Sequence, residues 1–326
     1  MPAALACCRD KILRGKDYTV HVSNGIYVTI YRGRFAPTPS GPLHFGSMVA
    51  AVGSFLDARS RGGTWLVRID DLDPPRSIPG AADAILRCLD AFGMHWDSQV
   101  VYQSTRNDAY HAALHQLRQS GGIYPCACSR REISDAGLAG VEGAVYPGTC
   151  RKSLTAGREA RALRVRTDTA AIEFDDGLQG HVRQALQAEI GDFVVYRSDH
   201  VFAYHLACAV DDAEQGVTDV VRGADLIAST PRQIHLQKLL GLPTPAYLHL
   251  PVAVNAMGEK LSKQTRAHAV EQSHPATTLG RLLRFLGHAP PAELAGTGVG
   301  ELWQWAFKNW QHENLPHASA ITAPEK

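Results

Sequence analysis

The stretch "GRFAPTPSGPLHFGSMVAAVGSFLDARSR", residues 33–61, most constrains the fold of this chain. A short apolar strand runs into a cluster of turn residues. Helical apolar spacing follows over residues 46–61, with Ser47 expected as the N-cap. A buried strand, "TWLVRI", and helices over residues 80–93 and 106–120 come next. This alternation predicts an α/β fold built on a doubly wound parallel sheet.

Composition excludes several classes of protein. The 326 residues are 45% apolar and carry a formal net charge of +1, which argues against a uniformly basic nucleic-acid coat. No apolar run approaches the roughly 20 residues of a membrane span. Seven cysteines, an odd number, do not suggest a secreted disulfide scaffold. We expect a cytoplasmic monomer whose thiols are reduced unless they bind a metal.

The pattern along the chain suggests three regions. Residues 1–31 form an extension, either disordered or a hairpin turning at Asn24-Gly25. Residues 32–270 are expected to form the main α/β domain, in which a cysteine- and arginine-rich insertion occupies about 98–185 and "VFAYHLACAVDD" has strand character. Residues 271–326 form a helical C-terminal segment.

The end of the first strand is where a doubly wound sheet binds its ligands. A helix N-terminus favours anionic phosphate, and Gly46 would let a flat group approach the backbone closely. His44 can then donate a hydrogen bond to a phosphoryl group as charge develops on it. The structural alternative is that His44 is simply a turn residue before a helix.

A second charged stretch, "GEKLSKQ", lies far downstream at residues 258–264. Its two ammonium groups, on Lys260 and Lys263, can clamp a triphosphate and neutralise a leaving pyrophosphate. Taken alone, the stretch also fits an exposed basic loop. The two stretches together, in this order, are far more specific than either.

The insertion carries a candidate metal site. Cys126 and Cys128 lie two residues apart, and Cys150 follows after a loop, so three thiolates can occupy three corners of a tetrahedron. No histidine lies within residues 122–158, so the chemistry alone leaves the fourth corner open. Buried cysteines without a metal are the alternative.

"RFAPTPSGPLHFGS" with the later "KLSKQ" resembles the two signature motifs of class I aminoacyl-tRNA synthetases. Over residues 32–270 the chain resembles, more narrowly, the glutamyl-queuosine tRNA(Asp) synthetase family, which is related to glutamyl-tRNA synthetase. In that family "HFGS" stands where other class I enzymes have His-x-Gly-His. The resemblance implies a Rossmann-type catalytic domain, with His44 and Lys263 catalytic. It also implies an ATP site made of His44, Gly46, Ser47, Lys260 and Lys263.

The resemblance further implies a glutamate site. Its expected residues are Arg34, Phe35, Ala36, Pro37, Thr38, Asp70, Tyr204 and Arg222. An arginine would grip a carboxylate of glutamate bidentately, and Asp70 would face the ammonium. Relatives often have "RIED" where this chain has "RIDD", so either the pocket tightens or a water bridges the gap at Asp70. Tyr204 also fits a core tyrosine, and Arg222 also fits an ion pair with Asp219 or Asp225.

The resemblance also implies one structural zinc ion per chain. Relatives use Cys-x-Cys followed by Tyr-x-x-x-Cys, which corresponds to Cys126, Cys128, Tyr146 and Cys150. Basic residues surround this set, and they suit salt-sensitive contacts with RNA phosphates. They are Arg130, Arg131, Arg151, Lys152, Arg158, Arg161, Arg164 and Arg166.

The resemblance implies a ligase that activates glutamate with ATP and Mg²⁺, then transfers the glutamyl group to the queuosine of tRNA(Asp). Only 62 residues follow Gln264, so we expect no anticodon-binding domain, and we expect the aromatic stretch "ELWQWAFKNW" to pack on the catalytic domain. The alternatives are a glutamyl-tRNA synthetase that charges the tRNA 3′ end and a catalytically inactive RNA-binding paralogue. A small-molecule nucleotidyltransferase, which would not need the insertion, is a further alternative.

Overall fold

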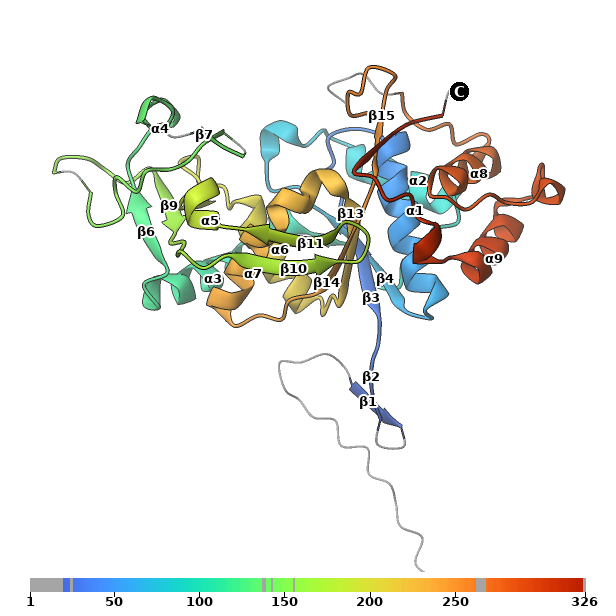
Figure 1. The fold of residues 1–326 in the computed structure, drawn as a ribbon, viewed down its shortest axis with the longest axis horizontal. Helices are drawn as coiled ribbons and strands as arrows, with labels where there is room; N and C mark the ends of the chain where they lie inside the picture. The colour runs from blue at the N-terminus through green and yellow to red at the C-terminus, as the bar shows by residue number, and fades with distance from the viewer. Residues whose placement is uncertain are drawn as a thin grey trace, which may run out of the picture.

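A computed structural model describes residues 20–23, 26–136, 139–141, 143–154, 156–261 and 268–324, with side chains from residue 30 onward. At its centre lies a sheet with the spatial order β5-β4-β3-β13-β14-β10-β11 (Figure 1). Its strands are β3 (Arg32–Phe35), β4 (Thr64–Ile69), β5 (Val101–Tyr102), β10 (Ile172–Asp176), β11 (Gly180–Gln184), β13 (Asp219–Gly223) and β14 (Ala246–Leu250). All ladders are parallel except β10–β11.

The two halves of the sheet meet between β3 and β13. Thr218 donates its backbone N–H to the carbonyl of Arg32 over 2.9 Å, and Arg32 donates its N–H to the Thr218 hydroxyl over 2.8 Å. The order of the strands changes direction here. From β3 the sheet continues to β4 and β5 on one side, and from β13 it continues to β14 on the other. Such a switch point opens a crevice at the carboxyl ends of the strands. The predicted doubly wound parallel α/β fold is therefore confirmed.

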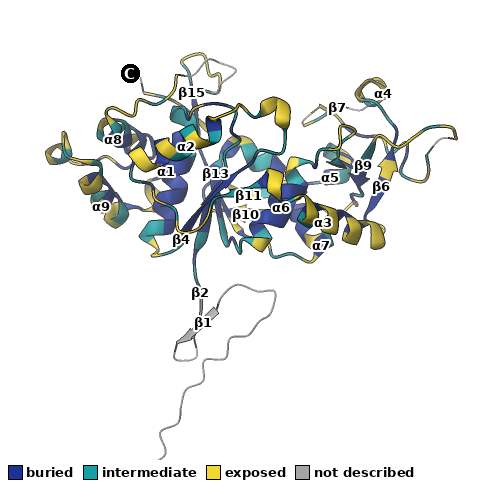
Figure 2. Ribbon diagram, turned by 180° about the vertical axis from the view of Figure 1, so that it is seen from behind, coloured by how far each residue is buried: buried dark blue, intermediate teal, exposed yellow. Residues whose placement is uncertain are grey.

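Helices cover both faces of the sheet (Figure 1). The helices of the catalytic region are α1 (Phe45–Ser60), α2 (Ala81–Ala91), α3 (Asn107–Gln119), α5 (Leu186–Glu189), α6 (Tyr204–Glu214) and α7 (Thr230–Leu240). The helices predicted over 46–61, 80–93 and 106–120 correspond to α1, α2 and α3. In Figure 2, α1 is buried along most of its length, which fits its place against the sheet.

The strand character predicted for "VFAYHLACAVDD" is wrong, because this stretch forms helix α6. A short continuous apolar run fits a buried strand and a buried helix equally well by periodicity. The helix is favoured here because it places the carboxylates of Asp211 and Asp212 inside the protein, where arginines bind both of them.

The insertion has its own antiparallel sheet, in the order β12-β9-β6, and lies at one end of the molecule (Figure 1). Its elements are β6 (Ile123–Cys126), α4 (Arg130–Ala136), β7 (Ala139–Gly140), β8 (Gly143–Ala144), β9 (Ala162–Val165) and β12 (Val194–Tyr196). Between β9 and β12 the chain returns to the central sheet as β10 and β11. The antiparallel sheet therefore extends to Tyr196, beyond the 98–185 range expected for the insertion.

The C-terminal segment packs on α1 and α2. It contains α8 (Pro275–Phe285), α9 (Val299–Asn309) and β16 (Ala320–Thr322), and β16 pairs in parallel with β15 (Val252–Val254). The Trp303 indole donates to the carbonyl of Phe92 over 2.8 Å, and Trp303 is buried in the same core as α1. The prediction that these rings pack onto the catalytic domain is confirmed.

Strands β1 (Val20–Ser23) and β2 (Ile26–Thr29) pair antiparallel near the N-terminus, with Ser23 opposite Ile26. The predicted turn at Asn24-Gly25 lies outside the described residues. Within the described part of the chain, no helix combines the length and the apolar character needed to cross a membrane.

Candidate active site

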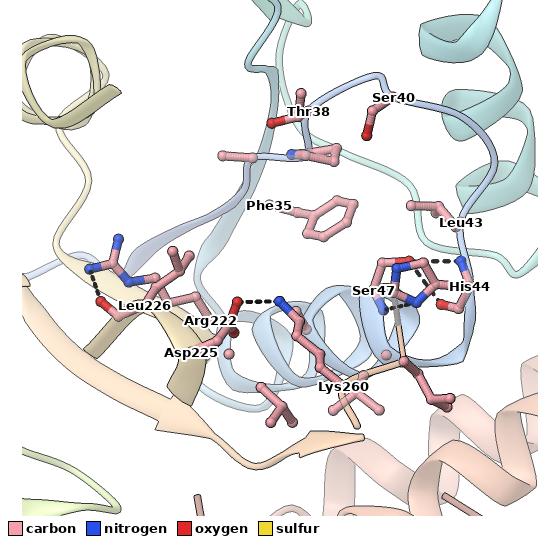
Figure 3. Close-up of a pocket in the computed structure, with 18 of the residues that line it drawn as sticks. Phe35, Thr38, Ser40, Leu43, His44, Ser47, Arg222, Asp225, Leu226 and Lys260 are labelled. Carbon is pink, nitrogen blue, oxygen red and sulfur yellow. Dashed lines mark hydrogen bonds and ion pairs between the residues drawn. The ribbon is translucent and has the colours of Figure 1, made fainter. Parts of the chain in front are cut away.

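A cavity of about 820 Å³ opens at the switch point, above β3 and β13. It brings together the residues expected at the two signature stretches, and Figure 3 shows its walls. The predicted residues that line it are Arg34, Phe35, Ala36, Pro37, Thr38, His44, Gly46, Ser47, Tyr204, Arg222 and Lys260. Asp70 lines a neighbouring cavity instead, and Lys263 lies outside the described residues.

His44, and not Ser47, is the N-cap of α1. Its backbone is extended, and its Nδ1 accepts from the backbone N–H of Ser47 over 3.2 Å. The Ser47 hydroxyl accepts in return from the N–H of His44 over 2.8 Å, which completes a capping box (Figure 3). Ser47 is thus the third residue of the helix. Since Nδ1 is an acceptor, the neutral imidazole carries its hydrogen on Nε2, where it can serve a ligand.

Gly46 joins the two signature stretches. A Cβ at this position would lie 3.3 Å from the carbonyl oxygen of Leu261 and 3.4 Å from the His44 ring. Leu261 directly follows Lys260, whose ammonium forms an ion pair with Asp225 on the other wall of the cavity (Figure 3). The sequence predicted that Gly46 lets a ligand come close to the backbone. In the structure the backbone of Leu261 also comes close to Gly46.

Arg222 is held from two sides at the end of β13. Its Nε donates to Nε2 of His249 over 3.1 Å, and its Nη2 donates to the Thr230 hydroxyl over 2.7 Å. Only 4% of Arg222 is exposed, and its Nη1 has no hydrogen-bond partner among the described residues. A buried cationic donor without a hydrogen-bond partner lowers the stability of the fold. The Nη1 of Arg222 is therefore suited to bind a carboxylate that enters the cavity. The alternative of an ion pair with Asp219 or Asp225 is not what the structure shows.

His249 connects Arg222 to a buried carboxylate. Its Nδ1 lies 2.5 Å from Oδ2 of Asp176, and both side chains are fully buried. Burial would raise the pKa of Asp176, but hydrogen bonds from His249 and from the backbone lower it. Burial lowers the pKa of His249, although Asp176 opposes this effect. A neutral ring that donates to Asp176 through Nδ1 leaves Nε2 as the acceptor that orients Arg222.

The resemblance noted in the sequence implies that glutamate binds at Arg222. On that expectation, His249→Leu should raise the KM for glutamate roughly tenfold in an ATP–pyrophosphate exchange assay, with a smaller change in kcat. The reason is that a buried Arg222 donor loses its acceptor, a loss of about 1–3 kcal/mol. His249→Gln should recover part of the loss, because its amide oxygen can accept from Arg222. His181→Leu is the matched control, since His181 is an exposed histidine that pairs with Asp175. An unchanged KM in His249→Leu would contradict a positioning role.

Arg34 already binds a carboxylate of the chain. Its Nε and Nη2 lie 3.1 and 3.2 Å from the two oxygens of Asp212, so the bidentate grip predicted for glutamate is made here with Asp212. Arg68 donates to Asp212 over 2.6 Å and to Asp70 over 2.8 Å. Burial raises the pKa of Asp70 to about 6, against the opposing effect of Arg68. Asp70 is therefore fixed within a buried network that the sequence motifs did not reveal.

The predicted metal ligands lie together at the insertion sheet. The sulfurs of Cys126, Cys128 and Cys150 all lie within 4.8 Å of one another, and those of Cys128 and Cys150 are 3.6 Å apart. The hydroxyl of Tyr146 lies 3.4 Å from the Cys126 sulfur and 3.8 Å from that of Cys128. Thiolates about 2.3 Å from a tetrahedral zinc are about 3.8 Å apart. The donor set thus fits a zinc ion in type and in spacing.

Arg164 packs against this cluster. Its Nε donates to the sulfur of Cys126 over 3.3 Å, and its guanidinium lies 3.9 Å from the centre of the Tyr146 ring. Its Nη1 also donates to the carbonyl of Asp192 over 2.6 Å. This arginine, expected to contact RNA, therefore contacts the cysteine cluster in the structure.

Comparisons with known proteins agree with this architecture. The sequence profile described as tRNA synthetases class I (E and Q), catalytic domain, matches residues 31–288. The chain therefore belongs to the class I tRNA synthetases. The glutamyl-Q tRNA(Asp) synthetase of Dechloromonas aromatica is 57% identical over 90% of this chain and 98% of its own length. That of Pseudomonas aeruginosa PAO1 is 51% identical over 91% and 98%. Within the class, this chain belongs to the family of glutamyl-Q tRNA(Asp) synthetases.

Solved structures support the fold. A glutamate tRNA ligase from Elizabethkingia meningosepticum, solved in complex with its amino acid, superposes with a TM-score of 0.74. The two proteins are 23% identical, and the match covers 89% of this chain and 66% of that one. A glutamate-tRNA synthetase from Elizabethkingia anophelis gives the same TM-score at 22% identity.

Proposed function

We propose that this protein activates glutamate with ATP and transfers the glutamyl group to the queuosine of tRNA(Asp). One observation carries the proposal: relatives named for this activity are 51–57% identical to the chain over 96–98% of their own length in several bacteria. The cavity supplies an independent argument for the first half-reaction, the activation of glutamate by ATP. It is lined by the buried cation of Arg222, which suits a carboxylate, and by the N-terminus of α1, which suits a phosphate.

ATP binds at the N-terminus of α1 in this proposal. His44 donates from Nε2 to a phosphate oxygen, and Gly46 gives the nucleotide access to the backbone. Lys260 exchanges its ion pair with Asp225 for the phosphates, and Lys263, three residues further along the sequence, also binds them. Mg²⁺ accompanies the nucleotide as a charge-neutralising partner. Ser47 contributes by capping the helix and fixing the tautomer of His44.

Glutamate binds between Arg222 and the β3 loop. Its side-chain carboxylate pairs with Nη1 of Arg222, and its ammonium faces Tyr204 and Asp70, where the two cavities adjoin. Residues 34–38 form the wall of this subsite. An oxygen of the α-carboxylate attacks the α-phosphorus in line, the P–O bond to pyrophosphate breaks, and glutamyl-adenylate forms. Positioning and charge neutralisation do the catalysis, without an enzyme nucleophile.

The second half-reaction moves the glutamyl group to a ring hydroxyl of queuosine. The hydroxyl oxygen attacks the carbonyl carbon of glutamyl-adenylate and forms an ester bond. The anhydride C–O bond breaks, its electron pair leaves on the phosphate of AMP, and the hydroxyl proton passes to water. The atoms balance with no further co-reactant.

A zinc ion completes the insertion in this proposal. Cys126, Cys128, Tyr146 and Cys150 would hold it, and four protein ligands close its coordination sphere, so its contribution is structural. Zinc binding would deprotonate the three cysteines, and the charge of the ion, together with Arg164 beside the Cys126 sulfur, would offset the resulting thiolates.

Purified protein is expected to contain one zinc per chain by elemental analysis. Cys128→Ser should lose the metal and destabilise the insertion, because metal binding at a structural site contributes directly to folding. Cys88→Ser is the matched control, since Cys88 is a buried cysteine on α2, away from the cluster, and should leave the zinc content at one. Metal-free wild-type protein that is fully folded would contradict the proposal.

ATP–pyrophosphate exchange tests the first half-reaction. We expect exchange that depends on glutamate and requires no tRNA. No exchange with glutamate, with or without tRNA, would indicate the inactive paralogue instead. Exchange supported by another amino acid in preference to glutamate would contradict the role given to Arg222.

A further inference from the structure

A second cavity of about 890 Å³ adjoins the first. It lies between α6 and the strands of the insertion sheet, and both cavities are lined by Ala36, Thr38, Arg76, Tyr204 and Leu226. Its volume is within the range of ligand pockets, about 300–1,000 Å³. In the proposed complex the ammonium of glutamate faces Tyr204 on this common wall, which puts the neighbouring carboxyl carbon close to it. A hydroxyl held in the second cavity is then placed to attack that carbon.

The second cavity is lined by arginines on one wall, by an aspartate on another and by aromatic side chains between them. Arg130 and Arg161, both exposed, line it from the insertion. Asp73 lines it from the turn after β4, and its side chain is 25% exposed. Tyr204, Phe193 and Phe202 provide aromatic side chains between these charges. A ligand with a flat ring, a cationic group and flanking phosphates would match this arrangement.

Asp73 is the carboxylate in this cavity with unused hydrogen-bonding capacity. Arg197 grips Asp199 with two hydrogen bonds of 2.6 and 3.0 Å, and reaches one oxygen of Asp73 at 3.4 Å. The other oxygen of Asp73, Oδ1, is inaccessible to water and accepts no hydrogen bond from the described residues. Oδ1 is therefore closed to a ligand in this conformation. The side chain as a whole is 25% exposed, and Oδ2 is held by the 3.4 Å ion pair with Arg197, so Oδ2 is the oxygen that can accept from a donor on a ligand.

We infer that the second cavity binds the modified nucleoside of the tRNA, with Asp73 receiving the cationic amine that distinguishes it from an ordinary base. This inference rests on the proposed function. Queuosine carries a secondary amine between its base and its cyclopentenediol, and such an amine is protonated at neutral pH. The base lies against the aromatic side chains, the phosphates contact Arg130 and Arg161, and the diol reaches the common wall at Tyr204. The competing occupant, a 3′-terminal adenosine, has no such cation.

Asp73→Asn tests this assignment. The KM for queuosine-containing tRNA(Asp) in glutamyl transfer is expected to rise at least tenfold, because the amine loses its charged partner. Glutamate-dependent ATP–pyrophosphate exchange, which uses the first cavity, serves as the folding reference and should change less than about twofold. Asp175→Asn is the matched control: this exposed aspartate at the end of β10 pairs with His181 and lines neither cavity.

Free nucleosides identify the occupant directly. Queuosine nucleoside should inhibit transfer by the wild-type protein, and at least tenfold less by Asp73→Asn, whereas guanosine and adenosine should inhibit neither. Equal transfer by wild type and Asp73→Asn, or inhibition by adenosine but not by queuosine, would overturn the inference. A wild-type protein that catalyses exchange but no transfer to queuosine-containing tRNA would instead overturn the proposed function.

Discussion

Arg222→Met is expected to raise the KM for glutamate by roughly 30- to 4,000-fold in ATP–pyrophosphate exchange. This range corresponds to the loss of one partner of a buried charge pair, about 2–5 kcal/mol. Arg222 has the features that make this loss large: it is 4% exposed, its Nε and Nη2 are fixed by His249 and Thr230, and its Nη1 has no hydrogen-bond partner in the described structure. The KM for ATP should change much less.

Two further variants sharpen this test. Arg222→Lys retains the charge but loses the planar fork, so most of the defect should remain. Arg183→Met is the matched control, because Arg183 is an exposed arginine on β11 that pairs with Glu173, and its removal should change neither KM. A KM for glutamate within threefold of wild type in Arg222→Met would contradict the glutamate site proposed here.

Asp57→Ala is expected to lower the free energy of unfolding by about 3 kcal/mol. Asp57 lies on α1, is 2% exposed, and accepts hydrogen bonds from three side chains: Tyr31 at 2.7 Å, Trp310 at 3.0 Å and His312 at 2.5 Å. It therefore ties the C-terminal segment to the helix that carries His44. Urea unfolding followed by tryptophan fluorescence measures the change.

The stabilisation from Asp57 should depend on pH. Burial would raise the pKa of Asp57, but the hydrogen bonds from His312, Trp310 and Tyr31 lower it below its usual value. The stabilisation is therefore complete above the unfolded-state pKa, about 3.9, and is lost as pH falls through the lower folded-state pKa. The difference between wild type and Asp57→Ala should be constant from about pH 5 to 7 and shrink below about pH 4. Asp90→Ala, at an exposed aspartate, is the control and should show neither effect.

Much of the architecture could be predicted because local patterns determine it. Helical spacing after the "HFGS" turn and the apolar strand before it are enough to position His44 and Gly46 at a strand end. The cysteine spacing likewise predicted a cluster that the structure assembles. Local patterns failed where tertiary contacts decide the outcome. The N-cap of α1 was predicted to be Ser47 and is His44. The apolar run predicted as a strand forms α6, whose two buried aspartates are bound by arginines.

Other parts of the site had no local signal at all. The partners of Arg222 are His249, 27 residues away, and Thr230, eight residues away, and neither is a carboxylate, so no charge pattern indicates them. Asp212 lies 178 residues from Arg34, the arginine that it binds. Such pairs become visible only when the sheet order is known, because β3, β13 and β14 bring their ends to one edge.

Labelled glutamate tests the central claim most directly. The protein is incubated with ATP, radioactive glutamate and tRNA(Asp) that carries queuosine or lacks it, with tRNA(Glu) in parallel, and each tRNA is digested to nucleosides. The account predicts label on queuosine alone, in an ester that mild alkali releases, and none on the other two tRNAs. Label on the 3′-terminal adenosine of tRNA(Glu), or equal labelling of tRNA(Asp) without queuosine, would contradict it.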